Sequence, residues 1–411
     1  MGVLKIQNNY ITNIQNIEVM QKVKISKVCK ISNGFAFKSD KYVGSNGARI
    51  IRITNVQKGR IVDNDPKLYP FSEVKNLDNY KINEGDIMMS LTGNVGRVGK
   101  FPKEFLPAYI NQRVCRIMPK TDELDTNYLF HFLNSDIFEN DAVRNSAGAA
   151  QLNLSTNWLS EYEIPLPTLD TQQKIANILD KADELRQYNK QLIEKYEALT
   201  QSLFLDMFGD PVKNEKGWDK TELKKFGKII TGNTPPRNDD ENYSSDFIEW
   251  LKTDNINDKF INVTQAKEYL SEKGFTKARF VEDGALLVAC IAGSIESIGR
   301  ASLTNRRVSF NQQINAIQPF DDVNSKYLYN LFRISKKHIQ NHASNGMKRM
   351  LTKGEFEKIL MIKPPINLQN LFAEQVQLIE DQKQQAQLAL AKSEALFQGL
   401  LQQAFNGELI N

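Results

Sequence analysis

Two long stretches of the chain place apolar residues at alternating spacings of three and four. In the first stretch these residues are Ile175, Ile178, Ala182, Leu185, Leu192, Tyr196, Leu199 and Leu203, with Asn189 at a polar position of the same seam. Residues 171–208 contain no glycine or proline, and Gly209-Asp210-Pro211 follows them. This spacing predicts a helix with a heptad seam, roughly 55 Å long at ~1.5 Å per residue.

The second stretch repeats this pattern near the end of the chain. Its seam consists of Phe372, Val376, Ile379, Ala386, Leu390, Phe397 and Leu400, with Lys383 and Ser393 at polar positions, and it ends at Asn406-Gly407. The simplest arrangement pairs the two helices antiparallel within the chain; alternatively, each packs on its own globular region or on another subunit. Asn189 is then either a buried residue that fixes the register or a solvated residue at the seam edge.

The rest of the chain alternates short β-rich runs with turns of glycine, asparagine and aspartate. The runs ARIIRITNV, GDIMMSLTG and NQRVCRIMP in the first half correspond to FIEWLKTDNI, GALLVACIAG and NQQINAIQP in the second. Short helices are expected around residues 128–133 and 327–332, and proline segments at 164–167 and 362–365 end each region. The pattern predicts two compact α+β domains.

These correspondences form one internal repeat. Asn55 matches Asn255, Gly93 matches Gly293, Gly99 matches Gly299 and Asn111-Gln112 matches Asn311-Gln312, each 200 positions apart. Further on, Gly148 pairs with Gly346 at an offset of 198 and Ile175 with Phe372 at 197. So long a period indicates a duplicated domain and not an array of small repeats.

Composition and charge narrow the class of protein. Of the 411 residues, 41% are hydrophobic and 25% charged, and no apolar run reaches the ~20 residues that span a bilayer. We expect a cytoplasmic protein without a membrane partner, because residues 1–16 lack the pattern of a signal peptide. The three cysteines lie far apart in the sequence and are expected to be buried and reduced. A net charge of +4 permits a polyanionic partner without requiring one.

Motifs for catalysis are missing from the sequence. There is no G-x-x-x-x-G-K-[ST] loop for ATP and no [DNS]-P-P-[YFW] motif of an amino-methyltransferase; Thr234-Pro235-Pro236-Arg237 and Lys363-Pro364-Pro365 are interpreted as turns. His338 and His342 have a spacing that could bind a metal, but no third ligand is evident. Three histidines in all do not supply a recognisable triad. We therefore predict no catalytic residue and no metal site.

The repeat, together with IPLPTLDTQQKIANIL after the first domain, KPPINLQNLFAEQ after the second and the closing AFNGEL, resembles the specificity (S) subunit of Type I restriction-modification systems. The resemblance covers almost the whole chain. It implies an α+β fold with two tandem target-recognition domains, separated by a long antiparallel two-helix coiled coil with a pseudo-two-fold internal repeat.

The resemblance also implies partners and cofactors. The partners are double-stranded DNA with an asymmetric bipartite target, two methyltransferase (M) subunits docked on the coiled coil, and restriction (R) subunits. S-adenosylmethionine would be bound by the M subunits and ATP with Mg²⁺ by the R subunits, and no cofactor by this chain. The departure of Lys363-Pro364-Pro365 from the first copy leaves the start of the second helix open.

On this basis the chain is divided into six segments. They are an N-terminal extension at 1–22, the first target-recognition domain at 23–167, a central helix at 168–208, a linker at 209–219, the second target-recognition domain at 220–365 and a C-terminal helix at 366–411. The extension has no counterpart in the second copy. It is either a helical segment that packs on the coiled coil or on an M subunit, or a frayed tail.

Residues that read bases are expected in loops between strands, where Arg or Lys suits guanine and Asn or Gln suits adenine. In the first domain the candidates are Asn55, Thr92, Asn94, Arg97, Arg113, Arg144, Asn145 and Gln151. In the second they are Lys252, Thr253, Asn255, Ser294, Arg300, Arg306, Arg307, Asn345, Lys348 and Arg349. Positions that differ between the copies, such as Arg97 against Ser297, are favoured for base choice. Asn111-Gln112 and Asn311-Gln312 are shared, which favours scaffold or phosphate roles.

Two other functions remain open from the sequence. A coiled-coil scaffold that binds proteins and no DNA would explain the helices, but not the polar loops in both copies. A methyltransferase or nuclease that acts alone would need the motifs that are missing.

Overall fold

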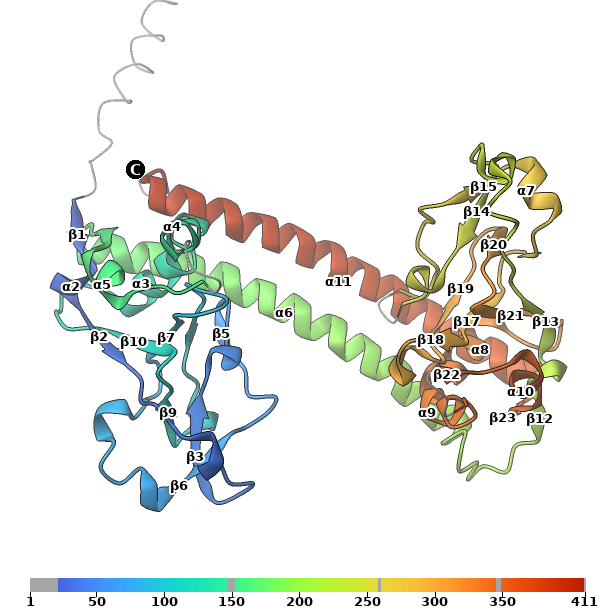
Figure 1. Ribbon diagram of the computed structural model, residues 1–411, viewed down its shortest axis with the longest axis horizontal. Coiled ribbons are helices and arrows are strands. Elements are labelled where there is room, and N and C mark those ends of the chain that lie inside the picture. Colours follow the sequence, from blue (N-terminus) through green and yellow to red (C-terminus); the bar gives the residue numbers. More distant parts are fainter. Residues whose placement is uncertain (1–20, 147–151, 258–259, 345–348, 410–411) are drawn as a thin grey trace, which may run out of the picture. The chain divides into compact units, whose positions relative to one another are not determined.

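The computed structural model of the chain describes residues 21–146, 152–257, 260–344 and 349–409 (Figure 1). The chain forms two compact units, one made of Met1–Asn189 with Ala389–Asn411 and the other of Lys190–Leu388. Each unit holds one globular domain and parts of two long helices, α6 (Leu169–Phe208) and α11 (Ile366–Asn406). Most of the extension predicted at 1–22 lies outside the described ranges.

The first domain is built on two sheets. A four-stranded antiparallel sheet has the order β2 (Cys29–Asn33), β10 (Val114–Pro119), β7 (Ile87–Ser90) and β8 (Val98–Lys100). In the second sheet, β3 (Gly47–Ile51) lies between β6 (Leu68–Pro70) and the parallel strand β9 (Ala108–Ile110). Further elements are the pairs β1 (Lys22–Lys24) with β11 (Glu163–Pro165) and β4 (Val56–Gln57) with β5 (Arg60–Ile61), and the helices α2 (Ile25–Val28), α3 (Thr126–Leu133), α4 (Asp136–Ser146) and α5 (Thr156–Glu161).

The second domain repeats this plan. Its antiparallel sheet has the order β13 (Gly227–Thr231), β21 (Ile314–Pro319), β17 (Leu286–Ala289) and β19 (Ala301–Leu303). The other sheet has the order β15 (Tyr269–Leu270), β14 (Ile248–Leu251), β20 (Val308–Phe310) and β16 (Phe280–Val281), with β14 parallel to β20. Further elements are the pairs β12 (Lys220–Glu222) with β23 (Leu360–Ile362) and β18 (Ile291–Ala292) with β22 (Arg349–Met350), and the helices α7 (Glu272–Thr276), α8 (Ser325–Ile334), α9 (Lys336–Gln340) and α10 (Lys353–Lys358). The predicted α+β duplication is confirmed.

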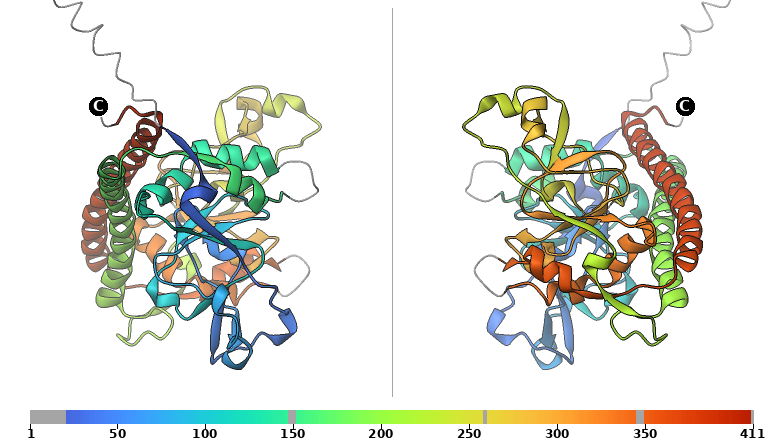
Figure 2. Two further views of the ribbon diagram at one scale, coloured as in Figure 1. Left: turned by 90° about the vertical axis from the view of Figure 1, so that its left-hand side faces the viewer. Right: turned by 90° about the vertical axis from the view of Figure 1, so that its right-hand side faces the viewer.

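In each unit the long helices run along one flank of the globular domain (Figure 2). A buried glutamine in the first turn of each helix fixes it there: Gln172 on α6 and Gln369 on α11 are fully buried. Gln172 accepts the N–H of Asp125 at 2.9 Å and donates to the carbonyl oxygens of Glu123 and Pro167 at 2.9 and 2.8 Å. Gln369 accepts the N–H of Asn324 and donates to Asp322 and Pro364 in the same way. Gln172 and Gln369, which stand 197 positions apart as Ile175 and Phe372 do, therefore anchor each helix to its domain.

The two helices pack antiparallel on one another within both units. In the first unit Asn189 is buried and its amide nitrogen lies 3.3 Å from the Ser393 hydroxyl. In the second, Lys383 is buried and its ammonium lies 3.1 Å from the Glu197 carboxylate. Of the two interpretations of Asn189, the solvated one is wrong. Polar contacts from the seam residues Asn189 and Lys383 thus cross the helix pair, where they restrict its register.

A polar cluster in the first unit joins the globular domain to α6. His131 of α3 is buried, and its Nε2 atom lies 2.7 Å from Oδ1 of Asp180 on α6. Asn127 donates to the other carboxylate oxygen, also at 2.7 Å. Burial by itself would raise the pKa of Asp180, but its hydrogen bonds to His131 and Asn127 and the positive charge of Lys100 hold that pKa below its usual value. The charged form of Asp180 is therefore favoured by folding.

This cluster predicts an acid-dependent loss of stability. A carboxyl group with a depressed pKa stabilises the fold above its unfolded-state pKa of about 3.9, and this stabilisation is lost as the pH falls through the lower folded-state pKa. We expect Asp180→Asn to be destabilised relative to the native chain at pH 7, with the difference shrinking below about pH 4. Denaturant unfolding between pH 3 and 7 measures this difference. The control is Asp170→Asn on the same helix, because Asp170 is exposed and pairs with Lys174 along the helix surface. A difference for Asp180→Asn that stays constant with pH would contradict the prediction.

Candidate nucleic-acid interface

In the first unit the loops that follow β2, β3, β7 and β9 meet at one edge of the domain. Backbone hydrogen bonds connect them: Gln112 N–H donates to Phe35, Asn111 N–H to Ile51 and Leu91 N–H to Arg113, at 2.9 to 3.0 Å. Gly93 N–H donates to Leu152 at 3.0 Å, which adds the segment after α4. We name this set, residues 34–35, 52–57, 91–97, 111–113 and 152–153, the first loop edge.

The second unit contains the matching edge. Asn311 N–H donates to Leu251 at 3.0 Å, Cys290 N–H to Gln313 at 2.9 Å and Leu351 N–H to Cys290 at 2.8 Å. Residues 231–234, 252–257, 290–297, 311–313 and 349–351 form this second loop edge. Both edges gather polar loops on a rigid sheet scaffold, as surfaces that bind macromolecules commonly do.

The matched asparagines at 55 and 255 build the edge from inside. Asn55 is 4% exposed and Asn255 is 6% exposed. The Asn55 side chain accepts the N–H of Arg52 at 2.9 Å and donates to the carbonyl oxygen of Val62 at 2.8 Å. Asn255 accepts the N–H of Lys252 at 3.0 Å and donates to the carbonyl oxygen of Gln265 at 2.9 Å. Each amide therefore fixes a short 3₁₀ turn and is occupied by backbone hydrogen bonds.

The shared Asn-Gln pair has a similar role. Asn111 and Asn311 accept the N–H two residues ahead, from Arg113 at 3.3 Å and Gln313 at 3.0 Å. Glycines at 34 and 232 let the end of β2 or β13 approach this turn, since a Cβ there would lie 2.1 or 2.2 Å from the asparagine carbonyl oxygen. The side chains of Gln112 and Gln312 are exposed at the tip. The asparagines therefore serve the scaffold, as the sequence comparison favoured.

Several of the predicted base-reading residues lie on the first loop edge. Asn94 and Arg113 are exposed there, while Thr92 and Arg97 are half-buried. Arg97 donates to the Gln57 side chain at 2.9 Å, which connects two loops of the edge. Arg144 and Asn145 are exposed in the last turn of α4, whose Ala142 packs against Gly96 of the edge. Gln151 lies outside the described ranges.

The second edge contains Lys252, Thr253 and Ser294, together with Arg349 in β22. Arg300 lies just beyond the edge, directly before β19. Arg306 and Arg307 lie elsewhere, because they precede β20 while the loop edge follows it. Arg306 makes a two-bond ion pair with Glu249 at 2.6 and 2.7 Å, and Arg307 pairs with Glu282 at 2.8 Å. Asn345 and Lys348 fall in the range that the structure does not describe.

Sequence reasoning missed one residue of the first edge. Arg52 occupies the position that matches Lys252, directly after β3, and its N–H is held by Asn55. The offset of 200 that relates Asn55 to Asn255 also relates Arg52 to Lys252 and could have identified it.

Cysteine and histidine side chains could act as nucleophiles or metal ligands, and their surroundings decide whether they are available for such roles. Cys29, Cys115 and Cys290 are free and buried, as predicted, and burial raises the pKa of each thiol to about 12, so none ionises near neutral pH. Burial, together with the nearby His342, lowers the pKa of His338. The described ranges contain no cluster of three or more His, Cys, Asp or Glu side chains that could hold a metal ion. None of the helices within these ranges is long and apolar enough to cross a membrane.

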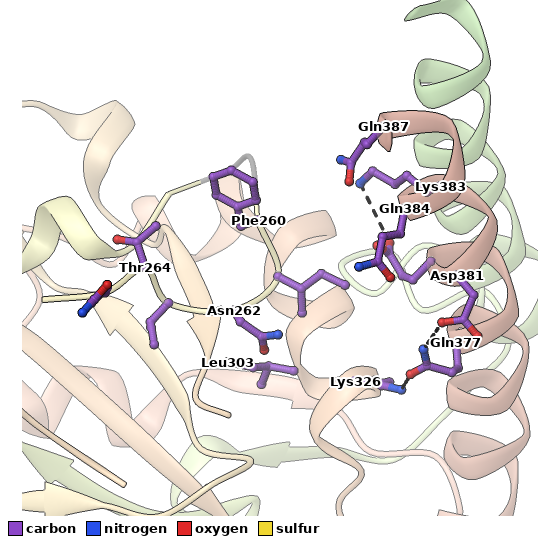
Figure 3. Close-up of a pocket in the computed structure, with 14 residues that line it drawn as sticks. Phe260, Asn262, Thr264, Leu303, Lys326, Gln377, Asp381, Lys383, Gln384 and Gln387 are labelled. Atoms are coloured by element: carbon purple, nitrogen blue, oxygen red, sulfur yellow. Dashed lines mark hydrogen bonds and ion pairs between the residues drawn. The ribbon is translucent and has the colours of Figure 1, made fainter. Parts of the chain in front are cut away.

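A groove of about 610 Å³ in the second unit lies between residues 260–265 and α11 (Figure 3). Several of its polar groups are paired with one another: Lys326 donates to Gln377, Gln377 donates to Asp381 at 2.6 Å, and Lys383 lies 3.9 Å from Glu380. The described lining contains neither histidine nor cysteine. The groove thus resembles a contact surface along the helix more than a catalytic pocket.

Two copies of one domain, each with a polar loop edge and each anchored to paired long helices, define a duplicated protein with two matched polar surfaces on a helical frame. The chain belongs to the family described as the Type I restriction modification DNA specificity domain, whose model matches residues 17–198 and 215–388. The resemblance inferred from the repeat is confirmed.

Individual relatives agree with this family. The specificity subunit of the Type I restriction enzyme HindI of Haemophilus influenzae is 22% identical over 438 residues, covering 86% of this chain and 94% of the relative. The MjaVIII specificity subunit of Methanocaldococcus jannaschii is 28% identical, but the match covers only 46% of each chain. The crystal structure of a Type I S subunit from M. genitalium matches with a TM-score of 0.57 at 16% identity, covering 94% of this chain and 96% of that one. At this identity the structural match shows a common fold.

Proposed function

We propose that the chain is the DNA sequence-specificity subunit of a Type I restriction-modification complex and recognises an asymmetric bipartite target in the cytoplasm. The observation that carries the proposal is the pair of matched loop edges, which share a scaffold and differ in their exposed side chains. Arg97 on the first edge stands where Ser297 stands on the second. A common scaffold with different polar side chains suits two half-sites of different sequence.

Within this proposal the direct base contacts come from exposed or half-buried polar residues on the loop edges or directly beside them. The candidates carried forward are Thr92, Asn94, Arg97, Arg113, Arg144, Asn145, Thr253, Ser294, Arg300 and Arg349. Arg306 and Arg307 contribute less, because they precede β20 whereas the loop edge follows it. The buried Asn55 and Asn255 act through the backbone of the turn.

Two M subunits, with R subunits added, would dock on the helices. Support comes from leucines left exposed on them: Leu185 and Leu396 in the first unit, and Leu199, Leu378 and Leu388 in the second, are 48 to 67% exposed. Rows of exposed leucine on a soluble helix commonly mark a protein interface. The chain itself would be non-catalytic, with S-adenosylmethionine held by the M subunits and ATP with Mg²⁺ by the R subunits. A protein scaffold without DNA binding would leave the paired loop edges unexplained.

Sequencing of methylated bases in a host that expresses the chain with its M subunit tests this function. We expect N6-methyladenine within one bipartite motif that is absent from cells with the M subunit alone. Failure to find any bipartite motif would contradict the proposal.

Exchange of the first domain provides a sharper form of the same measurement. Replacing residues 23–167 with the matching segment of another family member is expected to change one half of the motif and leave the other half intact. The spacing should also persist, because both helices are unchanged. A change in both halves would exclude reading by independent domains.

A further inference from the structure

In the first unit one carboxylate holds two cations beside the loop edge. The Asp65 carboxylate lies 3.5 Å from Nη2 of Arg52 and 3.0 Å from the ammonium of Lys67. Arg52 also donates to the backbone oxygen of Asp65 at 3.0 Å. Its Nε atom is buried and has no hydrogen-bond partner in the part of the chain that the structure describes. Hydrogen bonds from Lys67 and Arg52 lower the pKa of Asp65, so the carboxylate stays charged at neutral pH.

The second unit has the same arrangement beside its own edge. Glu268 lies 2.6 Å from Nη2 of Arg237 with one oxygen and contacts the ammonium of Lys252 with the other. The Arg237 guanidinium also stacks over the rings of Tyr243 and Trp250, at 4.3 and 4.8 Å from their centroids. Arg237, Lys252 and Glu268 remain 36 to 51% exposed.

The two clusters are built from different positions of the repeat. One cation of each cluster occupies the same position of the repeat: Arg52 in the first and Lys252 in the second. Both begin the 3₁₀ turn that Asn55 or Asn255 holds. The carboxylates are not matched: Ile50 N–H donates to Lys67 and Trp250 N–H donates to Glu268, which aligns Glu268 with Lys67 and not with Asp65. The arrangement recurs although the sequence positions that form it have changed, and each cluster carries a net charge of +1. Simple inheritance from the duplicated ancestor does not explain this.

We propose that the two clusters are phosphate clamps, each of which binds the DNA backbone beside the half-site that its loop edge reads. The first clamp is Arg52, Asp65 and Lys67, and the second is Arg237, Lys252 and Glu268. This inference rests on the proposed function. An arrangement common to both domains suits a backbone that is the same at both half-sites, since phosphate contacts position a protein without specifying sequence. The carboxylate holds two long cationic side chains in place, which lowers the ordering cost of binding.

Salt dependence of binding distinguishes a phosphate contact from a base contact. The complex of the full chain with its M subunit is titrated with a duplex carrying its methylated motif and with a scrambled duplex, over a range of salt concentrations. Arg52→Gln and Lys252→Gln are each expected to weaken binding to both duplexes by the same factor. The slope of log K against log salt should fall in magnitude by about one for each variant. The sequence motif that is methylated in cells should be the same for each variant as for the native chain.

Matched controls separate the clamps from general charge. Lys24→Gln and Lys224→Gln remove exposed, ion-paired lysines that precede β2 and β13, whereas the loop edges follow these strands. They should leave the slope unchanged. Arg52→Lys and Lys252→Arg keep the charge and should keep the slope, which rules out misfolding as the cause of a loss.

Each other outcome overturns the proposal in a recognisable way. The clamps would be excluded if the salt slope of the glutamine variants were unchanged, or if the slope fell equally in the controls. In either case the native complex would still bind its motif specifically, so the proposed function would stand. A motif altered at one half-site would make the residue a base reader instead. If the native complex showed no bipartite motif at all, the proposed function would fail and the clamps with it.

Discussion

Phe372→Ala is expected to lower the free energy of unfolding of the second unit by about 3–5 kcal/mol, the usual cost of removing a fully buried phenylalanine. Phe372 of α11 is fully buried and makes edge contacts with Phe204 and Phe208 of α6, with ring centroids 5.5 and 5.3 Å apart. Both of these rings also pack on Tyr327 of α8. One ring thus joins both long helices to the second domain, and its loss leaves a cavity where three elements meet.

Denaturant unfolding measures the total loss, and hydrogen exchange locates it. Amides of β17 and β21 should exchange faster, while those of β7 and β10 in the first unit should change little. The matched control is Leu371→Ala on the next residue of α11, whose side chain is 47% exposed and should cost at most about 0.5 kcal/mol. Equal losses for the two variants would show that the aromatic cluster does not have this role.

Gln172→Glu is expected to destabilise the first unit by about 3 kcal/mol or more at neutral pH, although it replaces a side-chain amide by a carboxylate of the same size. The side chain is fully buried, and its nitrogen donates two hydrogen bonds to backbone oxygens. A carboxylate cannot donate, so it would place a negative charge against two carbonyl oxygens. Protonation of the new glutamate would relieve part of this cost.

The pH dependence identifies this cause. Unfolding at pH 7 and pH 5 should show a smaller deficit at the lower pH, since burial raises the pKa of a carboxyl group. Gln173→Glu is the control, because Gln173 is the exposed neighbour on the same turn of α6. A deficit that is independent of pH, or one shared by Gln173→Glu, would contradict the explanation.

The helices and the duplication could be predicted because their signals are long. A seam maintained over many turns and matches spaced 200 residues apart are unaffected by local exceptions. Asn189 was more difficult to predict. Its position in the seam follows from the sequence, but only the packing of α11 shows that it is buried against Ser393. Periodicity was also wrong at seam positions such as Leu185 and Leu199, because these side chains are 48 and 49% exposed.

The candidate site was harder to predict, because the role of a polar loop residue depends on where its side chain points. Asn55 and Asn255 have the right chemistry for adenine, yet their amides are used by the backbone of the turn. Arg306 and Arg307 have the right chemistry for guanine, but they stand at the wrong end of β20. Asp65 and Glu268 come from positions that do not match in the repeat, so sequence comparison of the copies could not relate the two clusters.

The asparagine-held turn also bears on how such a protein can change over generations. Because Asn55 and Asn255 fix the backbone from below, exposed residues such as Asn94 or Ser294 can be substituted with little effect on folding. Under the proposed function, a new target then requires substitutions at these tips and none in the interior that fixes the fold. The constrained interior and the replaceable tips thus separate the stability of the fold from the proposed choice of target.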